Sequence, residues 1–137
     1  MRIRSIRPEF WASEDVAAMS WDTRLIFIGL WSYVDDNGVG RDVERLIVAA
    51  LFPLDEDLPE ASRRVTGALH HLSDHGQITR YTVDGKAYLH ITAWSKHQRI
   101  EKASKGRYPS PTCENAQIRE HSPTTPGALP DMSTPGA

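Results

Sequence analysis

Apolar residues recur with helical spacing in three stretches of the first 75 residues. The stretch from Trp21 to Val34 is apolar nearly all round, which is typical of a helix at the centre of a core or with one side in an oligomer interface. The next two stretches carry narrower apolar stripes at i, i+3 and i+4. The pattern predicts a short helix at 13–19 and longer helices over 21–34, 41–52 and 59–74. We expect four tryptophans to anchor the core: Trp11, Trp21, Trp31 and Trp94.

A β-hairpin is predicted after the third long helix. Two runs rich in β-branched and aromatic residues flank Asp84-Gly85, which is a strong signal for a two-residue hairpin turn. Such a turn pairs Val83 with Lys86 and Tyr81 with Tyr88. We expect one face, with Ile78, Thr82, Ala87, Leu89 and Ile91, to pack on the core. The other face is expected to be open to solvent and carries Thr79, Tyr81, Val83, Lys86, Tyr88 and His90.

The order helix, helix, helix, hairpin predicts an α+β fold of the winged helix-turn-helix type, with a three-helix core and a C-terminal β-hairpin wing. In that layout the third helix enters a major groove of DNA, and the hairpin flanks it. A small α+β domain with no nucleic-acid role shares this order, so the fold alone does not decide the function.

Composition divides the chain near residue 100. The 137 residues are 39% hydrophobic and 25% charged, which is the composition of one globular domain. Six of the nine prolines but only one of the eleven aromatic residues follow residue 100. Such a segment buries too little apolar surface to offset its ordering entropy. We therefore expect a folded domain over 1–100 and a tail over 101–137 that is first basic, then rich in Pro, Ser and Thr, and disordered.

The sequence argues against several functional classes. One cysteine, Cys113, excludes an intrachain disulfide and a CxxC zinc site. His71 and His75 have metal-ligand spacing but no third ligand nearby, so no metal site is expected. We find no phosphate-binding glycine loop, nucleophile elbow or paired carboxylates, and expect neither enzymatic activity nor a cofactor. There is no secretory signal and no apolar stretch long enough to cross a membrane. The expected location is the cytoplasm.

Charge is strongly polarised although the net charge is only −2. Residues 9–60 carry twelve acids against three bases, and residues 61–108 carry nine bases against three acids. The first eight residues add Arg2, Arg4 and Arg7, which suggests a basic arm with a weak indication of DNA contact. Chance clustering on a solvated surface is the alternative interpretation.

The basic residues of the third helix and of the segment after the hairpin are the candidates for DNA contact. Arg reads guanine through two hydrogen bonds, Thr meets phosphate or a thymine methyl group, and Gly allows close backbone approach. Dense Lys and Arg neutralise phosphates without reading sequence. An ordinary solvated helix face and a solubilising linker are the alternatives. The predicted DNA-binding residues are Arg63, Arg64, Thr66, Gly67, His70, His71, Lys86, Lys96, Arg99, Lys102, Lys105 and Arg107.

Four segments together resemble a family of small phage and prophage proteins typical of actinobacterial phages. These segments are IRSIRPEFW, RLIFIGLWSYVDDNG, VDGKAYLHITAW and KHQRI. Members are described as helix-turn-helix DNA-binding or replisome-organiser-like proteins, similar to the N-terminal domains of DnaD-like primosomal proteins. The resemblance implies a winged helix-turn-helix domain that binds origin DNA. Full replisome organisers recruit helicase or its loader through a separate C-terminal region, where this chain has a short Pro-rich segment.

The sequence therefore predicts a non-enzymatic protein that binds double-stranded DNA in phage replication initiation. A transcriptional regulator or an excision factor is the alternative within that class. A protein-docking module, whose acidic residues 9–60 meet a basic replication or host protein, is the alternative of another class. The second apolar side of the helix from Trp21 to Val34 suggests a homodimer.

Overall fold

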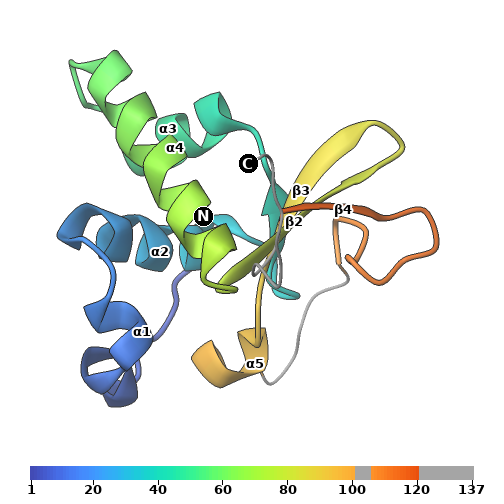
Figure 1. The fold of residues 1–137 in the computed structure, drawn as a ribbon, viewed down its shortest axis with the longest axis horizontal. Coiled ribbons are helices and arrows are strands. Elements are labelled where there is room, and N and C mark those ends of the chain that lie inside the picture. Colours follow the sequence, from blue (N-terminus) through green and yellow to red (C-terminus); the bar gives the residue numbers. More distant parts are fainter. Residues whose placement is uncertain (101–105, 121–137) are drawn as a thin grey trace.

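The computed structural model describes residues 1–100 and 106–120. Within this part, helices α2, α3 and α4 gather on one side, and an antiparallel sheet of order β1-β3-β2-β4 extends away from them (Figure 1). The elements are η1 (Pro8–Ala12), α1 (Glu14–Ala17), α2 (Trp21–Tyr33), β1 (Val39–Arg41), α3 (Glu44–Leu51), α4 (Leu58–Asp74), β2 (Ile78–Val83), β3 (Lys86–Ile91), α5 (Trp94–His97) and β4 (Gln117–Glu120).

Short polar side chains begin three of the helices. The side chain of Ser13 accepts a hydrogen bond from the backbone N–H of Val16, and Ser20 accepts one from Thr23. The carboxylate of Asp57 accepts one from the N–H of Glu60. Each such cap satisfies a backbone donor that the first helical turn leaves free. All the predicted helices are present, although α1 and α3 are shorter than expected.

The late start of α3 has a cause in the sheet. Arg41, the first residue of the predicted helix, is instead the last residue of β1, where it pairs with Tyr88. The helix can begin only after this pairing ends, at Glu44.

The core lies where α2 and α4 meet the inner face of the hairpin. It includes Phe27 and Trp31 of α2, Val65 and Leu69 of α4, and Leu89 of β3. A Cβ atom at Gly29 would lie 2.8 Å from the methyl carbons of Leu51, so glycine allows α2 and α3 to pack closely. Two of the four tryptophans are in the core as predicted, Trp31 and Trp94, whereas Trp11 is 66% and Trp21 84% exposed.

The hairpin has the predicted two-residue turn and register. Val83 pairs with Lys86, and Tyr81 with Tyr88. Asp84 and Gly85 have φ of 51° and 79°, as a two-residue turn between twisted strands requires.

The expectation of an open outer hairpin face is wrong. Tyr81, Val83 and Tyr88 are buried, because residues 106–120 return across this face and β4 pairs with β2. The hydroxyl of Tyr81 donates to the carbonyl oxygen of Pro109 at 2.6 Å. The folded part therefore extends past the predicted boundary at residue 100. The rest of the predicted disordered tail, 101–105 and 121–137, lies outside the described residues.

Candidate nucleic-acid interface

Helix α4 has one buried and one exposed side. Val65, Leu69 and Leu72 are buried against the core. The other side carries the predicted contact residues, and a Cβ atom added at Gly67 would meet nothing within 4 Å. Backbone here is open to close approach by a ligand. We call the exposed residues of this side the α4 surface: Arg63, Arg64, Thr66, Gly67 and His70.

Both arginines of the α4 surface are held in ion pairs with acids. The guanidinium of Arg63 lies 2.5 Å from the Glu60 carboxylate, one helical turn earlier. Arg64 lies 2.9 Å from Glu60 and 3.0 Å from Asp22, which belongs to α2. Hydrogen bonds from Arg63 are the main cause that lowers the pKa of the Glu60 carboxyl. The side chains of Arg63 and Arg64 nevertheless remain 70% and 47% exposed, so both are accessible to a phosphate.

Exposed ion pairs of this kind are weak, because water screens the charges and two long side chains lose freedom. A DNA phosphate can therefore take the place of either carboxylate on an arginine. The arrangement presents two cations already positioned on a rigid helix, with carboxylates as exchangeable partners.

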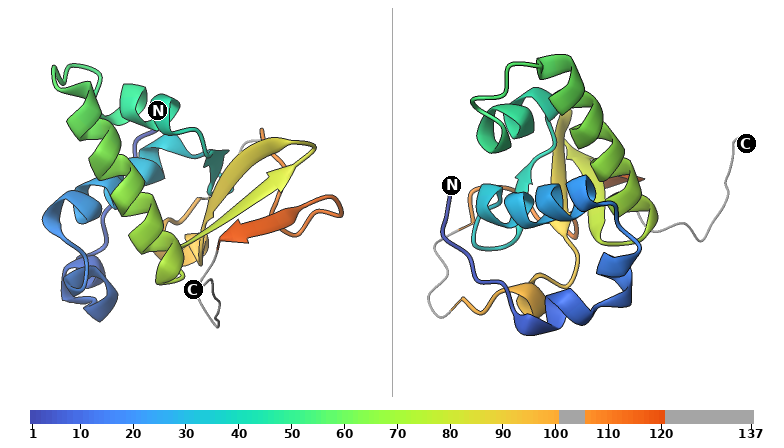
Figure 2. Two further views of the ribbon diagram at one scale, coloured as in Figure 1. Left: turned by 45° about the horizontal axis from the view of Figure 1, so that its top comes forward. Right: turned by 90° about the vertical axis from the view of Figure 1, so that its left-hand side faces the viewer.

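The hairpin turn and the N-terminal half of α4 point away from each other, with the first turns of α4 at the upper left of Figure 1 and the hairpin turn at the right. In Figure 1 both are in the upper part, on either side of α3, and Figure 2 shows the same divergence of α4 from the hairpin. Lys86 is exposed next to this turn.

The remaining described candidates lie at the other end of the sheet. Lys96 is in α5 and Arg99 follows it, and both are exposed. Lys86 is the first residue of the six-residue strand β3 and α5 follows the other end of that strand, so the two lie about 20 Å apart along the strand direction. Arg107 belongs to this end too, since its backbone N–H donates to the Asp35 carboxylate at 3.1 Å. The predicted residues thus form two separate groups, while Lys102 and Lys105 lie outside the described residues.

His71 is not part of the α4 surface. It is half-buried, and its ring stacks on that of His75 with centroids 4.0 Å apart. Burial, with a smaller contribution from His75, lowers the pKa of the His71 imidazole. In the described ranges 1–100 and 106–120, no group of three or more His, Cys, Asp or Glu side chains is arranged to hold a metal ion.

The basic N-terminal arm makes contacts within the folded protein. The Arg4 side chain is 6% exposed and donates to the carbonyl oxygens of Trp31, Val34 and Asp35. It also pairs with the Asp36 carboxylate at 3.1 Å. The suggestion that Arg4 reaches DNA is therefore wrong, because its donors are already bound inside the protein.

Sequence reasoning missed the acids that pair with the α4 surface. The i,i+3 and i,i+4 spacing of Glu60 to Arg63 and Arg64 was a sufficient signal for one of them. Asp22 comes from another helix, and no local pattern points to it.

Compared with protein-family models, curated proteins and solved structures, the chain matches none. Among the described residues, no helix has both the length and the apolar composition required to cross a bilayer.

Proposed function

We propose that this protein is a winged helix-turn-helix protein that binds double-stranded DNA through the α4 surface. The order α2, β1, α3, α4, β2, β3 and the strand order β1-β3-β2 support this assignment, since they are the order of such domains. The connection from Phe52 to Asp57 is longer than a typical helix-turn-helix turn of three to four residues. The strand β4 is an addition at the sheet edge.

The observation that carries the proposal is the exposed side of α4. It combines two guanidinium groups, a hydroxyl, an imidazole and an open glycine on one face of a helix of 17 residues. Phosphate contacts from the arginines would supply most of the affinity, and Thr66 and Gly67 would let the helix approach base edges. Lys86 at the hairpin turn would add a contact from the wing.

The biological process in which this protein acts is proposed from its resemblance to the family of small phage proteins. We propose phage replication initiation in the host cytoplasm, with no catalytic role. A phage transcriptional regulator or an excision factor requires the same DNA contacts.

A homodimer is part of the proposal. Trp21 and Leu25 lie one turn apart on α2 and are 84% and 60% exposed, which is unusual for large apolar side chains on a helix. Burying them against a second copy would place two α4 surfaces on successive half-sites. Sedimentation of Leu25→Ser against the unchanged protein tests this, and the proposal expects the variant to be monomeric at concentrations where the parent is dimeric.

The experiment for DNA binding is a mobility-shift titration of the full chain with pooled duplexes and single strands at several salt concentrations. Two double variants are compared, Arg63→Ala/Arg64→Ala and Lys96→Ala/Arg99→Ala. The proposal expects duplex binding that weakens with salt, with a log–log slope reduced by about two in the first variant. Equal binding by the first variant and the parent would contradict it.

A further inference from the structure

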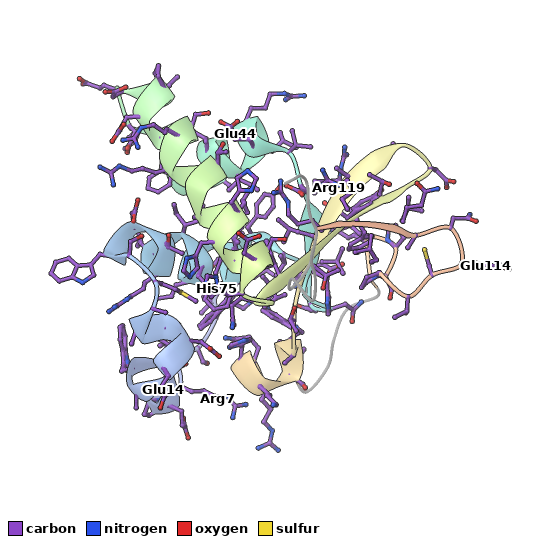
Figure 3. All side chains as sticks on the ribbon, in the orientation of Figure 1. Arg7, Glu14, Glu44, His75, Glu114 and Arg119 are labelled. Carbon is purple, nitrogen blue, oxygen red and sulfur yellow. The ribbon has the colours of Figure 1, made fainter. Side chains whose placement is uncertain are left out.

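A groove of about 620 Å³ opens between α3 and the first turn of α4, at some distance from the basic residues of α5. Its floor and walls are mainly apolar, and this volume is within the range of about 300–1,000 Å³ found for binding pockets. In Figure 3, Glu44 marks the α3 side of this region, while Arg7 is at the opposite end of the molecule. The residues that line the groove include Val48, Ala49, Phe52, Pro53 and Leu58.

Acidic residues lie around one end of the groove. The connection between the lining residues Pro53 and Leu58 holds Asp55, Glu56 and Asp57, and it contains no basic residue. All three acids are exposed, and Glu44 adds a fourth carboxylate on the groove wall. Arg45 is the one basic lining residue in the described part of the chain, so the four acids still leave this end of the groove negatively charged.

Exposed apolar side chains lie both in the groove and beside it. Leu54, in the same connection, is 91% exposed, and Leu58 is 55% exposed. A leucine that points into water within a run of acids contributes nothing to the fold by burial, and exposed apolar surface rimmed by polar groups is typical of an interaction site.

The apolar lining and the acidic end of the groove are unfavourable for binding nucleic acid. The carboxylates at the N-terminal end of α4 would repel phosphates, and Arg45 is the only basic residue among the described ones that line the groove. The groove is also distinct from the α4 surface, because it uses Leu58 and Ser62 of the helix rather than Thr66 and His70.

We propose that this groove is a docking site for an amphipathic helical segment of a partner protein, with an apolar stripe and flanking Lys or Arg residues. Helices of this kind lie in apolar grooves with side chains at i, i+3 or i+4, and i+7 as anchors. Here the anchors would occupy the space over Ala49 and Phe52, and the basic flanks would face Asp55 and Glu56. The charge of the rim decides the occupant, since a second copy of this acidic connection would be repelled.

The test uses a displayed library of random peptides of about 15 residues, which is about four helical turns, selected on the full-length protein. The proposal expects enriched peptides with apolar residues at helical spacing and a net positive charge. Two variants then locate the binding of a selected peptide. Ala49→Arg fills the exposed centre of the groove with a cation and should weaken binding about tenfold or more, as for a central interface residue. Asp55→Lys with Glu56→Lys should weaken binding most at low salt.

Matched controls separate local effects from global ones. Ala18→Arg and Glu114→Lys make the same types of change at exposed positions elsewhere and should leave peptide affinity unchanged. The thermal midpoint of each variant is measured first, so that an unfolded variant is excluded. If Ala49→Arg proves unfolded, Leu58→Ser at the exposed groove wall replaces it, with the same expected loss.

The proposal is overturned if no basic amphipathic peptide is enriched, if enriched peptides are acidic, or if their binding survives both groove variants. It is also overturned if the groove variants abolish self-association instead of peptide binding. The outcome is independent of DNA binding, because Arg63→Ala/Arg64→Ala should keep peptide affinity whether or not it loses DNA.

Discussion

Arginines in this protein belong to two contrasting environments. Arg4 and Arg80 are 6% and 13% exposed, and each has a buried carboxylate as its partner, Asp36 or Asp42. Arg63 and Arg64 are 70% and 47% exposed and pair with carboxylates at the surface. A buried guanidinium cannot leave its partner without leaving a charge unpaired, whereas an exposed one can exchange its partner for water or phosphate.

Positive charge in a sequence therefore does not by itself identify a binding surface. The arm with Arg2 and Arg4 has a charge density as suggestive as that of α4, yet Arg4 stabilises the turn after α2 through backbone carbonyls. Burial and the number of internal acceptors separate the two environments.

The largest expected effect is that of Arg4→Ala. It removes the hydrogen bonds to three carbonyls and the pair with Asp36, although Arg2 still lies 3.3 Å from Asp36. The free energy of unfolding should fall by about 3 kcal/mol, mainly because the carbonyls lose charged hydrogen-bond donors. Urea denaturation measures this, with the exposed Arg7→Ala as the control, for which a change within about 0.5 kcal/mol is expected. Equal effects of the two changes would remove the distinction between buried and exposed arginines.

A smaller loss is expected from Arg80→Met. Arg80 Nε lies 2.6 Å from the Asp42 carboxylate, which is 1% exposed and also bound by Arg119. Because Arg119 still neutralises Asp42, the variant should lose about 2 kcal/mol, within the range for hydrogen bonds to charged groups. Denaturation of the double variant Arg80→Met/Arg119→Met should show a loss larger than the sum of the two single losses. Strict additivity would show that the two arginines do not share Asp42.

The exposed pairs are expected to affect binding rather than stability. Glu60→Gln with Asp22→Asn releases both guanidinium groups from competing carboxylates, so duplex affinity should rise by a few-fold, corresponding to less than about 1 kcal/mol. Fluorescence anisotropy at low salt measures the affinity, and Asp74→Asn with Glu114→Gln, at two other exposed acids, controls for the same change of two in net charge. A fall in affinity in Glu60→Gln/Asp22→Asn, with this control unaffected, would mean that the acids position the arginines for DNA rather than compete with it.

The smallest effect is on the pH dependence of stability. Arginines stay charged throughout pH 5–8, so histidines should dominate any change there. Burial lowers the pKa of His71, His90 and His97 in the folded protein. The unfolded chain therefore binds more protons near and below pH 6.5, and the free energy of unfolding should fall as the pH decreases from 7 to 5. The slope should be smaller in His97→Phe, which keeps a ring between Trp31 and Phe27. A free energy of unfolding that rises on acidification would contradict these pKa directions.

The elements set by local sequence could be predicted, and those set by distant partners could not. Asp84-Gly85 specifies its own turn and thereby the register of two strands. In contrast, β1 is three residues long and is a strand only because β3 lies beside it. The burial of Arg4 and the return of residues 106–120 to the sheet depend likewise on contacts across the chain. Within the candidate site, helical spacing located the α4 surface, but it could not separate this surface from the basic residues at α5.

Mapping of backbone amide shifts of the full chain during titration with a duplex tests the central claim most directly. The account predicts that the largest changes fall on residues 63–70 of α4, with smaller ones at the hairpin turn around Lys86. Changes centred on α5 and Arg99, with α4 unaffected, would contradict the assignment of α4 as the helix that contacts DNA.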